Sequence, residues 1–459
     1  MKPCTIFLIL LQTLATARPN VLLIITDDQN DYATSASGID VQTPHLDAFK
    51  KQSLTFSNAS CASPVCGPSR ASMFSGLLPH RTGAYLNGSD PWNKSKALQE
   101  ATPLPELFRR SGYTSWGMGK LFHAPLPEDR KKKQWDNRAT ANGGFGPFPD
   151  PKFQIGGKFF GVQEWDKKDT DFADVKSANL AIANLKEQQP KPFFMVYGLW
   201  RPHNPWTAPR RFFDLYKPEK IQFPPPGYRE DDLDDVPPGG HKLAAIYQNR
   251  WDKAGDQNPD LWRRIMHGYL ACTSFADWNI GQVLKALDES PHADKTIVII
   301  TSDNGYHVGE KHHYGKSTLW EPSARVPLWI RLPGQKHAGK TCDAPVSLID
   351  LYPTLLKLCQ LEKPSQNLDG RDLSPLLSEP ESSWPHLSIT TYGEGRFTAR
   401  SQTHRYLRYP DGQEELYDHR KDPHEFQNLS GDEESKPLLN KFRSHLPKTW
   451  APSIGGRNG

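Results

Sequence analysis

The chain has 459 residues, a formal net charge of +4, six cysteines, and many glycine, proline and aromatic residues. This composition excludes a disulfide scaffold and is typical of a globular protein with long structured loops. The length allows two or three units, or one large α/β domain with an appendage, and no internal repeat is present.

Residues 1–17 combine a basic start, a short apolar run and an Ala15-Thr-Ala17 site. This pattern predicts a secretory signal peptide, because the apolar run is too short for a membrane span. No later stretch is apolar enough to cross a bilayer. We therefore expect a secreted, periplasmic or lysosomal-type location, with neither a membrane span nor a nucleic-acid partner.

The first strand after this segment contains five consecutive apolar residues, 21–25, and then Asp27 and Asp28. Such a run predicts a strand covered on both faces, as in a parallel sheet, where ligands bind at the carboxyl ends. Two adjacent carboxylates repel each other unless a proton or cation intervenes, and hard oxygen ligands suit Ca²⁺ or Mg²⁺. A solvated Asp-Asp turn is the alternative.

A helix is predicted for 44–53, and the stretch 61–76 follows it with Cys66-Gly-Pro68-Ser-Arg70 at its centre. Pro68 suits the first turn of a helix over 68–76, because proline has no N–H to satisfy there. The N–H groups at such a helix start favour an anion. The alternative is a buried cysteine beside a capped helix.

A second helix is predicted for 102–110, and a strand with a tight glycine turn then presents Lys120 and His123. This is no P-loop, because the glycine spacing differs and no serine or threonine follows the lysine. Taken singly, such residues are more often a surface lysine and a hydrogen-bonded loop histidine.

Residues 124–172 are expected to be irregular, with a basic run at 131–133 that is either solvated or attracts an anionic polysaccharide. A helix over 174–188 and a buried strand over 192–198 follow. This strand leads to His203, which two nearby prolines hold rigidly. The alternative for this stretch is a structural aromatic corner.

The proline- and acid-rich stretch 223–241 predicts an irregular rim loop. Helical spacing of apolar residues predicts one long helix over 259–290. The next strand ends at Asp303 and Asn304, which we expect beside Asp27 and Asp28. His307 could line the same site, and the absence of an H-E-x-x-H pattern argues against a zinc protease.

A strand is predicted for 326–331 and a helix for 348–359. Beyond about residue 375 the pattern changes to short strands with a turn, typical of antiparallel pairing. We therefore expect a catalytic domain over 18–375 and a C-terminal subdomain over 376–459.

These motifs resemble those of the type I, formylglycine-dependent sulfatases over nearly the whole chain that follows the signal peptide. The resemblance rests on the C-x-P-S-R motif at 66–70, on Gly-Lys120-Leu-Phe-His123 and on the residues around His203 and 302–316, and it is closest to iduronate-2-sulfatase-like members. Two positions depart from the pattern. Ser75 replaces a more usual Thr or Ala, and Asn304 stands where the iduronate enzyme has His, which puts the exact substrate in doubt.

The resemblance implies that a maturation enzyme oxidises Cys66 to formylglycine, whose hydrate attacks sulfur and then expels sulfate. It implies one Ca²⁺ per chain, held by the following residues: Asp27, Asp28, Cys66, Asp303 and Asn304. Lys120, Lys316 and Arg70 would supply positive charge. His203 would protonate the leaving oxygen, and His123 would assist the second step.

The same resemblance implies an alkaline-phosphatase-like α/β sandwich with a large, mostly parallel sheet and a small C-terminal α+β subdomain with an antiparallel sheet. The implied substrate is a sulfated sugar or polysaccharide fragment, such as one from glycosaminoglycan degradation. Two alternatives remain: a phosphoester or phosphonate hydrolase of the same superfamily, and a non-catalytic glycan-binding protein. The second would be indicated by a missing catalytic residue, and none is missing.

Overall fold

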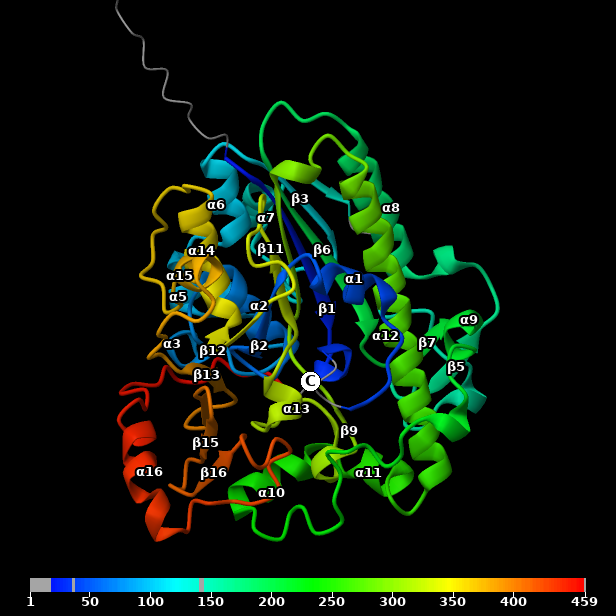
Figure 1. The fold of residues 1–459 in the computed structure, drawn as a ribbon, viewed down its shortest axis with the longest axis vertical. Coiled ribbons are helices and arrows are strands. Elements are labelled where there is room, and N and C mark those ends of the chain that lie inside the picture. Colours follow the sequence, from blue (N-terminus) through cyan, green and yellow to red (C-terminus); the bar gives the residue numbers. More distant parts are fainter. Residues whose placement is uncertain (1–17, 35–37, 140–143, 458–459) are drawn as a thin grey trace, which may run out of the picture.

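The computed structural model describes residues 18–34, 38–139 and 144–457 (Figure 1). The expected signal peptide, 1–17, lies outside the described residues. In the part of the chain that is described, no helix combines the length and the apolar character needed to cross a bilayer.

Within these ranges, eight strands form one large sheet. Their order across the sheet is β12 (Thr341–Ser347), β2 (Leu54–Ser60), β11 (Leu328–Arg331), β8 (Thr296–Ser302), β1 (Asn20–Asp27), β6 (Phe193–Pro202), β3 (Thr114–Gly119) and β4 (Asn137–Ala139). Every neighbouring pair is parallel except the two pairs that involve β11. The expected mostly parallel sheet is therefore confirmed.

Helices cover both faces of this sheet, which explains the continuous apolar run in β1 (Figure 1). Leu22 and Ile24 face a cluster that contains residues of α1 (Pro44–Lys50), α8 (Ala173–Lys186) and α12 (Pro259–Asp288). The alternate residues of β1 face the opposite cluster, with residues of α2 (Cys66–Ser75), α6 (Leu104–Arg110) and α14 (Leu351–Leu358). Successive side chains of a strand point to opposite faces of the sheet, so β1 contributes to the helical layers on both faces.

The backbones of β3 and β6 approach each other closely at their carboxyl ends. A Cβ atom built on Gly198 would lie 1.6 Å from the Lys120 carbonyl oxygen, and one on Gly119 would lie 1.9 Å from the Gly198 carbonyl oxygen. The Lys120 N–H also donates to the Gly198 carbonyl oxygen at 2.9 Å. Two glycines thus let the turn that carries Lys120 lie directly against β6.

The stretch 124–172 is less irregular than expected. It contains α7 (Glu128–Gln134), β4 and β5 (Val162–Trp165), and β5 pairs with β7 (Trp206–Pro209). The basic run 131–133 lies in α7, where Lys131 pairs with Glu128. The rim loop is also shorter than expected, because α10 (Pro238–Ala244) begins inside it with a proline in its first turn.

Several short elements complete the larger part of the molecule, which contains the eight-stranded sheet. They are α3 (Pro79–Thr82), α4 (Pro91–Lys94), α5 (Lys96–Glu100), α9 (Arg210–Phe213), α11 (Gln248–Ala254), β9 (His307–Val308), β10 (Tyr314–Gly315), α13 (Glu321–Ala324) and α15 (Ser374–Ser378).

The C-terminal part forms a four-stranded antiparallel sheet, as expected. Its order is β13 (Ser388–Thr391), β14 (Phe397–Arg400), β15 (His404–Arg408) and β16 (Glu414–Asp418), and α16 (Lys436–Arg443) packs on it. The sequence reasoning did not assign β16 as a strand. Each of its residues lies opposite a residue of β15 in antiparallel register, and this pairing gives the segment its structure.

A buried ionic cluster joins this four-stranded sheet to the part of the molecule that contains the large sheet. Arg405 on β15 contacts Glu321 on α13, and its Nε lies 2.7 Å from Glu425 Oε1. His419 Nε2 lies 2.9 Å from the same Glu425 oxygen. Glu321, His419 and Glu425 are close enough to hold a metal, but Arg405 already supplies the compensating charge.

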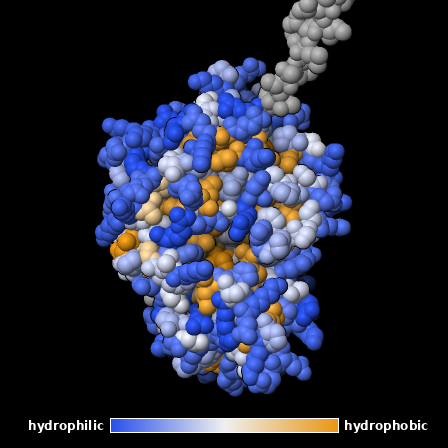
Figure 2. Space-filling model, turned by 90° about the vertical axis from the view of Figure 1, so that its left-hand side faces the viewer, coloured by the Kyte–Doolittle hydropathy of each residue, from blue (hydrophilic) through white to orange (hydrophobic). Residues whose placement is uncertain are grey.

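Figure 2 shows the face of the molecule that lies on the left in Figure 1. It is mostly hydrophilic, and its apolar side chains form small patches separated by polar ones. Such scattered apolar groups are normal for a protein surface. The five cysteines in the described ranges are all unpaired thiols and all buried.

Candidate active site

The two acidic segments meet at the carboxyl end of the sheet, as their positions after β1 and β8 predict. Thr26 lies opposite Ser302 in the parallel ladder, and the Asp28 N–H donates to Asp303 Oδ1 at 3.2 Å. Asp27, Asp28 and Asp303 are completely buried. Buried carboxylates need charged or hydrogen-bonding partners, so their surroundings define the site.

The turn at Asp28 has an unusual conformation, with φ at 61°. Tyr269 on α12 holds this turn, because its hydroxyl donates to the Asp28 carbonyl oxygen at 2.8 Å and accepts from the Asn30 N–H at 2.9 Å. Helical periodicity assigned Tyr269 only to the core. Its polar role depends on the crossing of α12 over the strand end, which the sequence does not reveal.

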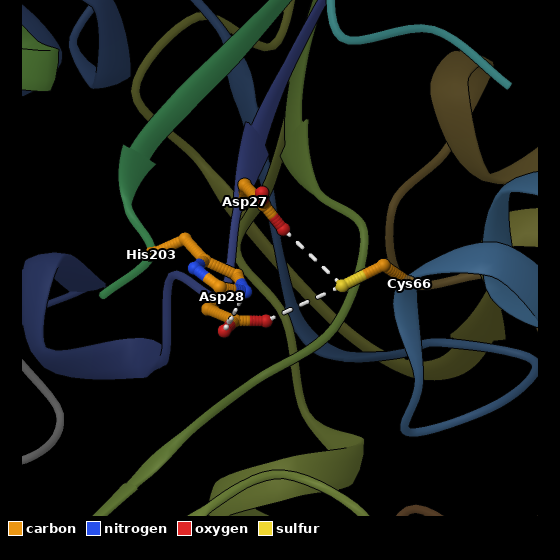
Figure 3. Close-up of side chains that lie close together, drawn as sticks. All are labelled: Asp27, Asp28, Cys66 and His203. Carbon is orange, nitrogen blue, oxygen red and sulfur yellow. Dashed lines mark hydrogen bonds and ion pairs between the residues drawn. The ribbon is translucent and has the colours of Figure 1, made fainter. Parts of the chain in front are cut away.

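Cys66 is the first residue of α2, and its sulfur points toward the aspartates (Figure 3). The sulfur lies 3.3 Å from Asp27 Oδ1, 3.6 Å from Asp28 Oδ1 and 2.7 Å from Lys316 Nζ. Burial raises the pKa of the Cys66 thiol well above its usual value, and the Asp27 charge raises it further. The unmodified side chain is therefore a protonated thiol and a poor nucleophile at neutral pH.

Asn87 fixes the turn at Cys66, a role that the sequence motifs did not reveal. Its Oδ1 accepts from the Gly67 N–H at 2.8 Å. A Cβ atom at Gly67 would lie 2.7 Å from this oxygen and 3.4 Å from His123 Nδ1. Position 67 therefore has no room for a side chain between Asn87 and His123.

The two predicted lysines reach the aspartates from different loops. Lys120 Nζ lies 2.5 Å from Asp27 Oδ2, and Lys316 Nζ lies 2.7 Å from Asp28 Oδ1. Burial disfavours the charged form of Lys316, but the negative groups around it, led by the Asp28 carboxylate, together outweigh this effect and raise the pKa of Lys316 well above its usual value. The ammonium group of Lys316 thus stays charged inside the site.

Arg70 connects Asp303 to the turn that carries Lys120. Its Nε donates to Asp303 Oδ2 at 2.7 Å, and its NH1 donates to the Lys120 carbonyl oxygen at 2.6 Å. Among the described residues, the Arg70 guanidinium donates to Asp303 and to backbone carbonyl groups, and it makes no hydrogen bond to the Cys66 sulfur. Arg70 therefore positions the acidic and basic segments of the site relative to each other.

His203 and His123 both line the cavity beside this cluster. His203 Nε2 lies 3.4 Å from Asp28 Oδ2 (Figure 3), and its ring packs on Phe145 with centroids 4.4 Å apart. Burial lowers the pKa of His203 to about 4, although Asp28 acts in the opposite direction. His123 is exposed to the cavity, and desolvation by the surrounding protein, together with the Lys120 charge, lowers the pKa of His123 well below its usual value.

His307 does not line the site, contrary to expectation. Its ring is buried, with Nδ1 2.9 Å from the Glu310 carbonyl oxygen and Nε2 2.7 Å from Thr318 Oγ1. The spacing from Asp303 placed it near the cluster in sequence, but β9 turns its side chain into the interior.

The donor set fits a hard divalent cation. Three buried carboxylates converge with Asn304, whose Oδ1 is buried and has no hydrogen-bond partner among the described residues. Ligand atoms of Asp27, Asp28, Cys66 and His203 lie within 4.8 Å of one another. Oxygen ligands of this kind suit Ca²⁺ or Mg²⁺.

The charges of the cluster are balanced as they stand. The carboxylates of Asp27, Asp28 and Asp303 face three cationic groups: Lys120, Lys316 and Arg70. A divalent cation alone would upset this balance, whereas a divalent cation together with an anionic ligand largely preserves it. The site is therefore suited to take up both together.

A cavity of about 710 Å³ opens above the cluster, and Lys316, His123 and His203 are among the residues that line it. Its size is in the range of sites for small molecules or sugar units. The site thus joins a polarising cluster to a space large enough for an ester substrate.

Comparison with known proteins identifies the family. The family model described as "Sulfatase" matches residues 19–361. The chain belongs to the sulfatase family. A second model, "N-sulphoglucosamine sulphohydrolase, C-terminal", matches residues 309–451 of this sulfatase.

Curated relatives agree with this assignment. A protein named "Sulfatase" from Formosa agariphila is 36% identical over 458 residues, covering 95% of this chain and 87% of the relative. "Iduronate 2-sulfatase" from Homo sapiens is 27% identical, covering 75% of this chain and 70% of the relative. The protein is therefore a sulfuric ester hydrolase, as expected from the motifs.

Solved structures show the same fold. A "2-O GAG sulfatase" superposes with a TM-score of 0.71 and 24% identity, over 94% of this chain and 91% of the other. A phosphonate monoester hydrolase of Agrobacterium radiobacter superposes with a TM-score of 0.75 and 22% identity, over 94% and 97%. The expected alkaline-phosphatase-like architecture is confirmed.

Proposed function

We propose that this sulfatase removes sulfate from a sugar unit of a sulfated glycan, with a nucleophile made from Cys66 and with Ca²⁺. The observation that carries this proposal is the position of the Cys66 sulfur, 2.7 Å from Lys316 Nζ and 3.3 Å from Asp27 Oδ1, beside an open cavity. Relatives named "Ulvan-active sulfatase" and "Iduronate 2-sulfatase" support a sugar substrate.

The proposed nucleophile is formylglycine, made from Cys66 by a maturation enzyme. The C-x-P-S-R sequence supports this modification, and so does the raised pKa of the thiol, which leaves the unmodified side chain poorly reactive. When present, the modified side chain would supply an oxygen nucleophile that can attack sulfur and later release sulfate.

The proposed metal ligands are the five residues named from the resemblance: Asp27, Asp28, Asp303, Asn304 and the modified Cys66. Bound Ca²⁺ would polarise a sulfate oxygen. The unpartnered Asn304 oxygen and the three buried carboxylates support this assignment.

The remaining residues of the site have distinct proposed tasks. Lys120 and Lys316 hold the negative sulfate, and Arg70 keeps Asp303 in place. His203 donates a proton to the departing sugar oxygen, because it borders both Asp28 and the cavity. An anionic ester beside the ring favours its protonated form, which offsets the effect of burial. His123, close to Gly67, assists release of sulfate.

The location and domain boundaries are also proposals. A signal peptide at 1–17 would direct the protein to a secreted, periplasmic or lysosomal-type compartment. A catalytic domain at 18–375 and a subdomain at 376–459 agree with the large sheet and the four-stranded sheet described above.

Sulfate release from defined sulfated oligosaccharides tests the function. The protein is made with and without a formylglycine-generating enzyme, and free sulfate is measured by ion chromatography. We expect release only from the matured protein. Faster hydrolysis of a phosphonate monoester, at a rate that does not depend on maturation, would instead favour the phosphonate hydrolase alternative.

A further inference from the structure

The cavity extends beyond the catalytic cluster to a second group of charged residues. Apart from Lys316 and the two histidines, the acidic and basic side chains that line it are Asp90, Arg250 and Arg457. Asp90 accepts a hydrogen bond from Asn93 Nδ2 at 2.7 Å. This outer part of the cavity therefore carries an excess of one positive charge.

Arg250 is held in place by packing and not by a carboxylate. Its guanidinium stacks over Tyr247 at 4.0 Å and over Phe160 at 5.0 Å, and NH1 donates to the Tyr314 carbonyl oxygen at 3.4 Å. Among the ion pairs of the described residues, none involves Arg250. Most donors of a half-buried, stacked guanidinium thus remain available to a ligand.

Arg457 reaches the cavity on a segment that lies along residues 80–87. The Ala451 N–H donates to the His80 carbonyl oxygen at 2.7 Å, and the Ile454 N–H donates to the Gly83 carbonyl oxygen at 3.1 Å. The red ribbon beyond α16 follows this path toward the middle of the molecule in Figure 1. The segment is therefore fixed by backbone hydrogen bonds before it reaches the cavity.

The last of these hydrogen bonds links Arg457 to the nucleophile turn. The Arg457 N–H donates to the Asn87 carbonyl oxygen at 2.7 Å, while the Asn87 side chain accepts from the Gly67 N–H at 2.8 Å. One residue thus sets the position of both Arg457 and the turn at Cys66. The described residues provide no ion-pair partner for the exposed Arg457 guanidinium.

We propose that Arg250 and Arg457 bind a second anionic group of the substrate, a carboxylate or a further sulfate, while the catalytic cluster binds the sulfate ester. This inference rests on the proposed function and narrows the substrate to sulfated sugars with at least two negative charges. Both guanidinium groups line one cavity, and neither has a carboxylate partner among the described residues, so the cavity favours an anion. Each guanidinium offers paired donors suited to a planar carboxylate or a tetrahedral sulfate.

Competitive inhibition of p-nitrophenyl sulfate hydrolysis tests the inference, because inhibition does not require turnover of the sugar. The probe is an unsaturated heparin disaccharide with one uronate carboxylate and two sulfates. The measured quantity is the ratio of the probe's inhibition constant to the KM of the aryl sulfate. For Arg250→Met and Arg457→Met we expect this ratio to rise about tenfold, since a charged hydrogen bond typically supplies that factor or more.

Arg211→Met is the matched control. Arg211 also stacks on aromatic rings, Phe212 and Trp278, but its guanidinium pairs with Asp169 away from the cavity. We expect the ratio of the two constants to be unchanged in this variant. Arg457→Lys should recover part of the lost discrimination, because it restores the charge without the fork geometry.

Two altered probes distinguish the sources of the second charge. If the carboxyl-reduced disaccharide no longer distinguishes wild type from the methionine variants, then the arginines bind the carboxylate. If a disaccharide that lacks one sulfate loses the distinction instead, they bind sulfate. An equal effect of Arg457→Met on the aryl sulfate and on all probes overturns the inference. Absence of sulfate release from sulfated oligosaccharides by matured wild-type protein would instead count against the proposed function.

Discussion

The ammonium nitrogen of Lys316 lies 2.7 Å from the sulfur of Cys66, and the same nitrogen lies 2.7 Å from Asp28 Oδ1. One lysine therefore contacts both the nucleophile position and a proposed metal ligand. Any group that replaces the thiol at this position would therefore contact the positively charged Lys316 ammonium. This relationship makes the chemical state of Cys66 the first property to measure.

Mass spectrometry of the tryptic peptide 52–70 checks the nucleophile. This peptide contains both Cys61 and Cys66, so Cys61 serves as an internal control. In protein matured by a formylglycine-generating enzyme, we expect iodoacetamide to label Cys61 while Cys66 is found as an aldehyde. Fully active protein in which both cysteines are labelled would rule out this nucleophile.

Replacement of Asp28 should remove the metal and the activity together. We expect Asp28→Ala to lose about one equivalent of Ca²⁺ and to slow sulfate release by about 10²-fold or more, since Lewis-acid stabilisation is typically several kcal/mol. Metal content is measured by atomic emission after dialysis. Asp260→Ala, at a carboxylate with 95% of its side chain exposed, is the control and should change neither property. A variant that retains both metal and rate refutes the site.

His203→Ala should affect substrates according to their leaving groups. A sugar alkoxide needs a proton in the transition state, whereas a nitrophenolate does not, and general acid catalysis typically contributes about 10²–10⁴-fold. We expect turnover of the sulfated sugar to fall by about this factor and turnover of the aryl sulfate to fall far less. His241→Ala, at an exposed position on α10, is the control. Equal slowing of both substrates would assign His203 to sulfate binding instead.

The ionic cluster between the subdomains should be important for stability. Glu425→Gln leaves Arg405 without one of its two buried carboxylate partners, so we expect the free energy of unfolding to fall by about 3–5 kcal/mol. Urea denaturation followed by tryptophan fluorescence measures this change. Glu433→Gln removes an exposed pair with Lys436 and should stay within about 0.5 kcal/mol of wild type. Similar values for both variants would contradict the role of the cluster.

Asp350 should make stability depend on pH. Burial raises the pKa of Asp350 to about 7, although the Ser347 and Arg371 N–H groups oppose the shift. Because the folded state then holds a proton that the unfolded state has lost, the contribution of Asp350 to stability falls as the pH rises from about 4 to 7. The maximum slope is about 1.4 kcal/mol per pH unit.

Asp350→Asn should remove this part of the pH dependence. We expect the unfolding free energy of the wild type, measured by urea denaturation, to fall relative to that of the variant as the pH rises from about 4 to 7. Asp432→Asn, at an exposed position, should leave the wild-type dependence in place. Parallel curves for wild type and Asp350→Asn would mean that Asp350 ionises normally in the folded protein.

Local sequence patterns predicted those parts of the fold whose structure is determined by residues close together in the sequence. The apolar run of β1, the helical spacing of α12 and the acids after β1 and β8 all lie where expected. The rule that parallel strands end at the same edge was enough to bring Asp28 and Asp303 together.

The remaining features depend on contacts between distant segments. β16 becomes a strand by pairing with β15, and Arg70 turns to Asp303 because that carboxylate lies beside its helix. Arg457 enters the cavity only because its segment pairs with residues that precede it by hundreds of positions. No local pattern marks such contacts, so the sequence left open that His307 lines the site and gave no indication of Arg457.

The close approach of Gly119 and Gly198 predicts that neither position tolerates another amino acid. A methyl group at either position would overlap a carbonyl oxygen of the facing backbone, so even alanine requires the two strands to separate. In a library of all single substitutions selected for sulfate release, both positions should be as depleted as Cys66, although neither has a functional group. Lys120 would move with the displaced strand, so the tolerance of these sites to mutation is set by backbone spacing and not by chemistry.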